Sequence, residues 1–380
     1  RSAKASERSP GRRWREAAAT YERALPLAPR SVDLRIRFGS ALLSEGGSRN
    51  AARARDVLRE ALAMRGTDER AMYLLSQAER LSGDVQAAEA TARRLVAQNG
   101  RSARAYLALA EALEEGQRYQ AVADALAPAV TRFRSERAGE TPSILMLLLP
   151  HLGFAYQQLG QLDKAMGVFE EAQKLSPDDP TVTTYLIQAQ LAGKKYGPAA
   201  ELAHAARAAH PDDLRLAQLE AQALRQGGKV DQGLAVLTDL MQRHADSPGV
   251  YVALAQYYSD ANRGARALEV LQDARTKFPS ETSVAFQLGA VLDKQKRYAE
   301  SEAVFRQLVA NEPQNAVALN YLGYMLAERG ERLEDSVDFV TRALKVEPEN
   351  GSYLDSLGWA YYKSGKIDLA LEHLKLAADK

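Results

Sequence analysis

The chain has 380 residues, of which 46% are hydrophobic and 26% charged, a balance typical of a folded protein rather than a disordered one. Lys and Arg total 50 against 49 for Asp and Glu, and this net charge of +1 gives no overall attraction to nucleic acid or acidic membranes. The absence of cysteine excludes disulfides, thiolate zinc sites and cysteine nucleophiles.

Residues 1–31 combine a basic leader with one predicted helix. Basic residues crowd the start without interleaved aromatic side chains: Arg1, Lys4, Arg8, Arg12, Arg13 and Arg15. We therefore expect a solvated leader rather than a surface for nucleic acid or lipid headgroups. Residues 14–29 have helical spacing that ends at Pro29. Because the first residue is Arg1 rather than Met, we expect any signal peptide or lipid-anchor cysteine to lie upstream.

A period of 34 residues runs along most of the remaining chain. Pro177 and Pro211 are 34 positions apart, and so are Gly289 and Gly323. A proline just beyond a helix end stops that helix, so a regular proline predicts a regular stop. Each period holds two amphipathic helical segments separated by a short polar turn. In one clear unit the two apolar faces are formed by Leu149, Leu152 and Tyr156, and by Leu162, Ala165, Phe169 and Ala172.

This pattern resembles the tetratricopeptide repeat, a helical hairpin with a period of 34 residues. The resemblance implies an all-α fold, a right-handed α-solenoid of about ten hairpins, in which each hairpin buries its apolar face against its neighbours. Residues 14–29 match a lone second helix of such a unit. The first helices are predicted to begin near Val32, Glu69, Ala103, Ile144, Pro180, Asp212, Pro248, Thr282, Gln314 and Gly351. Some units match weakly, because Ser76 and Ala110 replace the glycine of the first helix and Gly233 replaces the alanine of the second.

Two arms of repeats are predicted. Residues 32–134 form an amino-terminal arm of three degenerate repeats. Residues 144–380 form a carboxyl-terminal arm of seven repeats, the last of them truncated.

An insertion separates the two arms. Leu109 and Leu152 occupy equivalent positions but are 43 residues apart, so about nine residues are inserted relative to the 34-residue period. Residues 135–143 are predicted to form this inserted connection, and Pro128 to interrupt the helix before it. The connection is either a hinge or the join of a merely longer pair of helices.

Residues able to carry catalysis are sparse. The histidines are scattered, with no pair at the spacing of metal ligands: His151, His204, His210, His244 and His373. Glu114 and Glu115 are adjacent, so on a helix their carboxylates point in different directions and do not form a catalytic pair. We therefore predict no enzyme active site, no metal site and no cofactor. The longest apolar run, Ile144 to Leu149, is also far too short to span a bilayer.

The family resemblance implies a partner-binding groove lined by the first helices. In its middle part the positions that face the groove are polar and rich in amides: Tyr185, Gln188, Arg215, Gln218, Gln222, Arg225 and Gln256. In its last units they are aromatic with a few polar partners: Phe286, Asn320, Tyr321, Tyr324, Asp355, Trp359 and Tyr362. Exposed rings of this kind suit a binding hot spot for a protein or peptide. The alternative is that Tyr321, Trp359 and Tyr362 pack between repeats.

The last 65 or so residues are similar to the carboxyl-terminal units of tetratricopeptide lipoproteins and envelope proteins of Gram-negative bacteria. The resemblance is carried by the segments Asn320–Gly330 and Tyr353–Tyr361. One such group tethers a carboxyl-terminal processing protease at the outer membrane and presents its substrates. The resemblance implies a non-catalytic adaptor or scaffold in the bacterial periplasm or at the outer membrane, with the cytoplasm as the alternative location.

Two other functions remain open from the sequence. One is the substrate-recognition arm of a larger enzyme, such as a protein glycosyltransferase that carries these repeats. The other is a component of an envelope secretion or polysaccharide-export assembly. In each case the expected partner is a protein or peptide segment.

Overall fold

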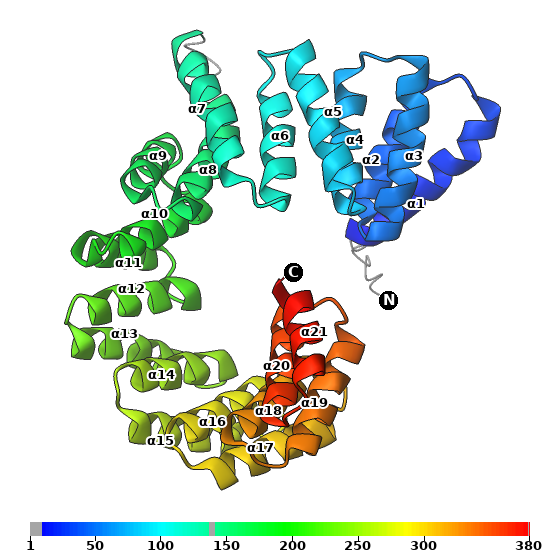
Figure 1. Ribbon diagram of the computed structural model, residues 1–380. Helices are drawn as coiled ribbons and strands as arrows, with labels where there is room; N and C mark the ends of the chain where they lie inside the picture. The colour runs from blue at the N-terminus through cyan, green and yellow to red at the C-terminus, as the bar shows by residue number, and fades with distance from the viewer. Residues whose placement is uncertain (1–9, 137–140, 379) are drawn as a thin grey trace, which may run out of the picture. The chain divides into compact units, whose positions relative to one another are not determined.

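The computed structural model describes residues 10–136, 141–378 and 380, and all regular secondary structure within these ranges is helical (Figure 1). A first helix, α1 (Pro10–Ala24), is followed by a short 3-10 turn, η1 (Leu25–Leu27). The helices that follow form ten antiparallel pairs, so the predicted all-α class and the predicted lone helix before the first hairpin are confirmed.

The first five pairs are α2 (Val32–Glu45) with α3 (Ser48–Met64), α4 (Glu69–Leu81) with α5 (Val85–Gln98), α6 (Ala103–Glu115) with α7 (Tyr119–Glu136), α8 (Thr141–Gln158) with α9 (Leu162–Leu175), and α10 (Pro180–Ala192) with α11 (Tyr196–Ala209). The other five are α12 (Leu214–Gln226) with α13 (Val230–Arg243), α14 (Pro248–Asp260) with α15 (Gly264–Lys277), α16 (Thr282–Lys294) with α17 (Tyr298–Asn311), α18 (Ala316–Arg329) with α19 (Leu333–Val346), and α20 (Gly351–Lys363) with α21 (Ile367–Ala378).

The chain divides into two compact units, residues 1–206 and 207–380, with the boundary inside α11. The predicted division into two arms at residues 135–143 is a different division of the chain and stays a prediction. In each unit the first helix of a pair contacts the first helix of the next pair, as α4 contacts α6 and α18 contacts α20. One face of every first helix is therefore shared with its neighbours.

Helix starts follow the predicted positions closely. The largest displacement is three residues, from the predicted Ile144 to Thr141. Many first helices begin behind a side chain that caps the free amides of the first turn: Asp68 accepts from the amide of Ala71, and Asp213 from that of Leu216. Local hydrogen bonds thus fix the start of many, though not all, of the first helices.

The turn inside each pair holds at least one residue with a positive φ, and from Gly83 onward such a residue recurs with the period of the repeat. Glycine supplies it at several positions, such as Gly160 (φ 70°) and Gly228 (φ 82°). Elsewhere a residue with a side chain is held there: Gln117, Lys194, Asn262 and Lys296 all have φ between 53° and 62°. A Cβ atom in this conformation is strained, so these turns carry a local cost that glycine would not.

The two helices of a pair cross where one of them has a small residue. A Cβ added to Gly153 on α8 would lie 2.5 Å from the Phe169 ring on α9. In the weakly matching unit with Ser76, the hydroxyl donates a hydrogen bond to the carbonyl of Ala88 on the facing helix. At Gly233 the hydroxyl of Tyr257 occupies the space, 2.3 Å from where a Cβ would lie. At Ser76 and Gly233, where the sequence departs from the repeat pattern, a local contact therefore compensates for the changed residue.

The inserted residues lengthen two helices. Both α7 and α8 have 18 residues, against 14 in α9 and 13 in α10. Of the predicted connection 135–143, the first two residues belong to α7 and the last three to α8. Residues 137–140, where a hinge was predicted, lie outside the described residues.

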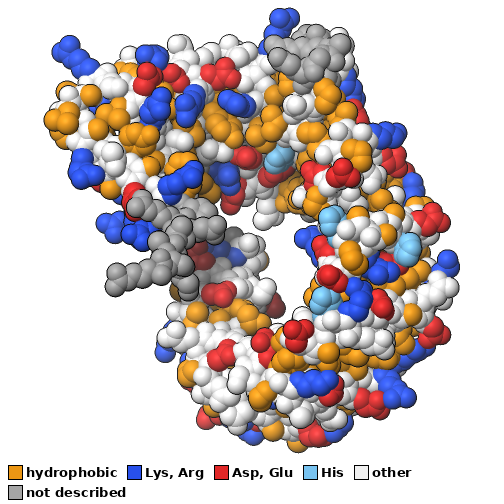
Figure 2. Space-filling model, turned by 180° about the vertical axis from the view of Figure 1, so that it is seen from behind, with side chains coloured by type: hydrophobic (Ala, Val, Ile, Leu, Met, Phe, Trp, Pro, Cys, Tyr) orange, Lys and Arg blue, Asp and Glu red, His pale blue; other side chains and the backbone are white. Residues whose placement is uncertain are grey.

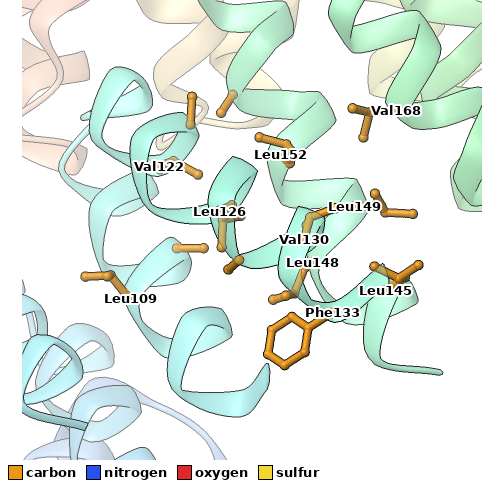
Figure 3. Close-up of a cluster of buried hydrophobic side chains, with 14 of the residues drawn as sticks. Leu109, Val122, Leu126, Val130, Phe133, Leu145, Leu148, Leu149, Leu152 and Val168 are labelled. Atoms are coloured by element: carbon orange, nitrogen blue, oxygen red, sulfur yellow. The ribbon is translucent and has the colours of Figure 1, made fainter. Parts of the chain in front are cut away.

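The prediction that Pro128 interrupts its helix is wrong, because α7 continues through it. Pro128 is exposed, and the turn that follows buries Ala129, Val130 and Phe133. Burial of these side chains outweighs the hydrogen bond that a proline removes. They belong to an apolar cluster shared by α6, α7, α8 and α9, whose larger members are drawn in Figure 3.

A buried carboxylate ties together the pairs near the end of the chain. Glu302 on α17 is 6% exposed and bonds Arg306 at 2.7 Å, Arg329 at 3.2 Å and also Arg332. Burial alone would raise the pKa of Glu302, but the three arginines outweigh it and lower the pKa. This network fixes the carboxyl end of α18 against α17 and the start of α19.

Glycine placed in the strained turns should stabilise the protein. We expect Lys194→Gly and Lys296→Gly each to raise the free energy of unfolding by about 0.5–1 kcal/mol, because relief of the left-handed strain exceeds the entropic cost of glycine. Urea unfolding followed by circular dichroism measures the change. The reciprocal control is Gly228→Ala, which should destabilise; if both lysine variants are also destabilised, the strain is not real.

Candidate functional site

In the unit of residues 207–380, the first helices carry a row of polar and aromatic side chains. The amide-rich part lies on α12 and α14, around a hollow of about 350 Å³. Its lining is Arg215, Gln218, Leu219, Gln222, Arg225, Leu237, Ala253, Gln256, Tyr257 and Asp260. All five polar residues predicted for this unit therefore line the hollow, together with Asp260, which was not predicted: Arg215, Gln218, Gln222, Arg225 and Gln256.

Hydrogen bonds hold part of this row in place. Gln287 on α16 donates to Gln256 Oε1 at 2.5 Å, and Gln256 donates to Asp260 Oδ1 at 2.8 Å. Arg225 lies 3.7 Å from the Asp260 carboxylate. Among the described residues, the side chains of Gln218 and Gln222 have no hydrogen-bond partner, so their amides can donate to and accept from another molecule.

Two of the predicted groove aromatics lie in the packing between repeats. Phe305, which is fully buried, stacks on Tyr321 with ring centroids 4.6 Å apart and meets Phe286 edge-on at 5.3 Å. The Tyr321 hydroxyl donates to Asp293 at 3.3 Å, and burial together with this carboxylate raises the pKa of Tyr321. Phe286 and Tyr321 are therefore mainly core residues that border the surface.

The other three aromatics are more accessible. Tyr324 is 43% exposed and Tyr362 is 52% exposed. Trp359 is partly buried and stacks on Tyr362 at 5.4 Å, while its indole N–H donates to Glu328 Oε2 at 2.9 Å. Rings held in this way present contact area that needs little ordering upon binding.

A second hollow, of about 600 Å³, lies beside the Tyr324 ring. It is lined by Asn320 and Tyr324 of α18, by Gly351, Ser352, Asp355 and Ser356 of α20, and by Leu374, Ala377 and Ala378 of α21. Three predicted residues, Asn320, Tyr324 and Asp355, thus meet in one place. Burial and the negative charges of Glu328 and Asp355 raise the pKa of Tyr324.

The two remaining predicted residues belong to the other unit. Tyr185 on α10 stacks on the buried Phe169 with ring centroids 5.6 Å apart, so its ring is committed to packing. Gln188 is partly buried on the same helix.

A cluster of ionisable residues on α4, α6 and α8 was not predicted. Glu114 lies 2.9 Å from His151 Nδ1, and Glu115 lies 3.3 Å from Arg80. Burial alone would lower the pKa of His151, but the bond to Glu114 and the charges of Glu114 and Glu111 raise it. Adjacent glutamates do point apart, as expected, yet each finds a partner on a neighbouring first helix. The sequence signal was the run of three glutamates, at 111, 114 and 115, on one helix.

The surface has no extended region of one charge in the view of Figure 2, where acidic and basic side chains are interspersed. Among the residues that the structure describes, no group of three acidic or histidine side chains is placed to hold a metal ion. Within the same ranges, no helix has the length and apolar character needed to cross a membrane.

Comparison with protein families gives a consistent assignment. One model described as a tetratricopeptide repeat matches residues 43–100, 218–282, 252–316 and 286–344, and a second with that description matches residues 156–223. The matches together cover more than half of the chain. The chain belongs to the tetratricopeptide repeat family. Its fold is that of a protein-interaction scaffold.

A curated relative is the TPR repeat-containing protein PA4667 of Pseudomonas aeruginosa, which is 29% identical over 171 residues. The match covers 44% of this chain but only 29% of that protein.

Several solved tetratricopeptide structures are similar at low identity. PilF of Pseudomonas aeruginosa is 18% identical with a TM-score of 0.46, covering 65% of this chain and 99% of PilF. A tetratricopeptide repeat protein from Parabacteroides merdae is 14% identical with a TM-score of 0.48, covering 67% and 97% of the two chains. MamA from Desulfovibrio magneticus is 22% identical with a TM-score of 0.37, covering 43% and 93%.

The bond between His151 and Glu114 should make tetratricopeptide packing in the first unit depend on pH. Because the folded pKa of His151 is raised above its ordinary value of about 6.5, its stabilising contribution is complete below that pH and is lost as pH rises through the folded pKa. Wild type should therefore be more stable than His151→Gln in mild acid, with the difference shrinking in mild base. Unfolding in urea at both pH values, with the exposed His210→Gln as control, checks this; a constant difference would contradict it.

Proposed function

We propose that this chain is a non-catalytic adaptor that holds an extended protein segment along the first helices of residues 207–380. The observation that carries the proposal is that the exposed Tyr324 ring lines a hollow, while the exposed Tyr362 ring stacks on the partly buried Trp359 on α20, the helix that forms another part of the lining. Binding energy in protein interfaces is concentrated at such rings, where a partner side chain is shielded from water.

The amide-rich hollow complements this anchor. The free amides of Gln218 and Gln222 each offer a donor and an acceptor, which is what the backbone of an extended chain requires of its surroundings. Such contacts depend little on the sequence of the bound segment, whereas the aromatic end selects side chains. One surface thus binds the backbone of an extended segment at the amide-rich hollow and selects its side chains at the aromatic end.

The finer role that we propose is delivery of the bound segment to a partner enzyme in the bacterial periplasm or at the outer membrane, with a carboxyl-terminal processing protease as the candidate. Two features support this role: the likeness of the last two repeats to envelope adaptors, and a bacterial relative with the same repeats. The chain spans less than a third of that relative, so the relative's own partners are not transferred.

Photocrosslinking in the cells that make the protein tests the binding surface and the compartment together. A benzophenone amino acid at Tyr324 and, separately, at Gln222 should capture the same partner, because both positions lie on the proposed surface. The control position is Val346, which is exposed at the end of a second helix. Equal capture from Val346 would contradict the surface. A captured cytoplasmic protein would overturn the envelope role, whereas a protease or its cell-wall hydrolase substrate would support it.

Removing the exposed rings should weaken capture without unfolding the chain. For Tyr324→Ala combined with Trp359→Ala we expect at least about a tenfold loss of partner binding, the size typical of hot-spot truncation. Helix content by circular dichroism should persist. As a matched control, Tyr321→Ala should lower the melting temperature, because its ring stacks on the buried Phe305. Collapse of the double variant would show that its rings are core.

A further inference from the structure

The hollow between α18, α20 and α21 contains hydrogen-bond acceptors that lack donors. Asp355 has no hydrogen-bond or ion-pair partner among the described residues, although its neighbours on α18 line the same hollow. Asn320 Oδ1 is inaccessible to solvent and accepts no hydrogen bond from the described part of the chain. That atom is out of reach of another molecule, whereas the Asp355 carboxylate is exposed and open to a donor from a partner.

The electrostatics of the hollow favour a positive donor. The carboxylates of Glu328 and Asp355 act on the Tyr324 phenol from two sides, on α18 and α20. The exposed Tyr324 ring adds a negative π-face, on which a cation is attracted. The basic groups nearby are already engaged: Lys363 lies over the Trp359 ring at 5.3 Å, and Lys380 pairs with Glu349 at 3.5 Å.

The shape of the hollow fits a long side chain with a charged tip. One wall is apolar and is formed by Leu374, Ala377 and Ala378. On α20 the lining includes the small residues Gly351 and Ser352. Lysine and arginine carry an apolar stem of three or four methylene groups that packs on such a wall while the charged end meets polar atoms.

We propose that this hollow binds the side chain of an arginine or lysine residue in the partner segment, with its stem on the α21 wall and its charged group between the Asp355 carboxylate and the Tyr324 ring. This inference rests on the proposed function, since it specifies which residue the segment presents at the aromatic end. It also implies that the two hollows prefer side chains of opposite charge, because the hollow on α12 and α14 is lined by Arg215 and Arg225.

The experiment uses a fluorescent, extended glycine–serine peptide with one central arginine, and the same peptide with citrulline, which has the shape of arginine without its charge. Anisotropy measures the affinity of the full chain for each peptide. Because the chain has two tryptophans, Trp14→Phe leaves Trp359, one turn from Asp355, as the single indole signal that reports where the peptide binds. We expect the arginine peptide to bind about tenfold more tightly than the citrulline peptide, the value of one charge-assisted hydrogen bond, and to shift the Trp359 signal.

The variant Asp355→Asn should abolish the preference for arginine. Its matched control is Asp338→Asn, which removes the same charge from an exposed site on α19, where Asp338 faces Arg342; the preference should survive there. Equal binding of both peptides, or equal effects of the two variants, would overturn the proposal. If both peptides bind equally and both lose affinity on Tyr324→Ala, the proposed function stands and only the cation preference fails. If neither peptide binds and crosslinking from Tyr324 captures nothing, both fail.

Discussion

The whole structure depends on how closely the two helices of each pair cross. Where the first helix has a glycine at the crossing, a large side chain of the second helix fills the space, as Phe169 does over Gly153. This contact fixes the angle of the pair and so determines which face of the first helix turns toward its neighbours. Two of these crossings also have a hydrogen bond from the second helix to the first: Ser301 donates to the carbonyl of Gly289, and Ser336 to that of Gly323. The surface row is a consequence of these crossings, because each one presents equivalent positions at equal intervals.

The sequence predicted the elements well because their determinants are local. Capping residues, prolines after helix ends and small residues at crossings all act within one hairpin, so helix starts were placed within three residues. Pro128 was misjudged because its effect depends on burial of Phe133 against α6 and α8, which the pattern within α7 does not show. The extra residues could be counted from the period, but their distribution between α7 and α8 depends on packing that no local pattern encodes.

The candidate site was less predictable for a related reason. Position in the repeat says that a residue lies near the inner surface, but not whether a neighbouring ring covers it. Tyr321 and Tyr324 are three residues apart on one helix, yet the first stacks on Phe305 and the second is exposed. Likewise, the pair of Glu114 and His151 joins residues 37 positions apart on two different first helices. Contacts between repeats therefore determine which of the candidate residues remain available to a partner.

The two hydrogen bonds that link Gln287, Gln256 and Asp260 run in one direction, each donated toward the carboxylate. A carboxylate only accepts, so it orients the Gln256 amide with its nitrogen toward Asp260 and its oxygen toward α16, where the nitrogen of Gln287 meets it. The charge of Asp260 thereby sets the orientation of two neutral amides, that of Gln256 on α14 and that of Gln287 on α16. A single acidic side chain thus orders the amide dipoles of two successive repeats.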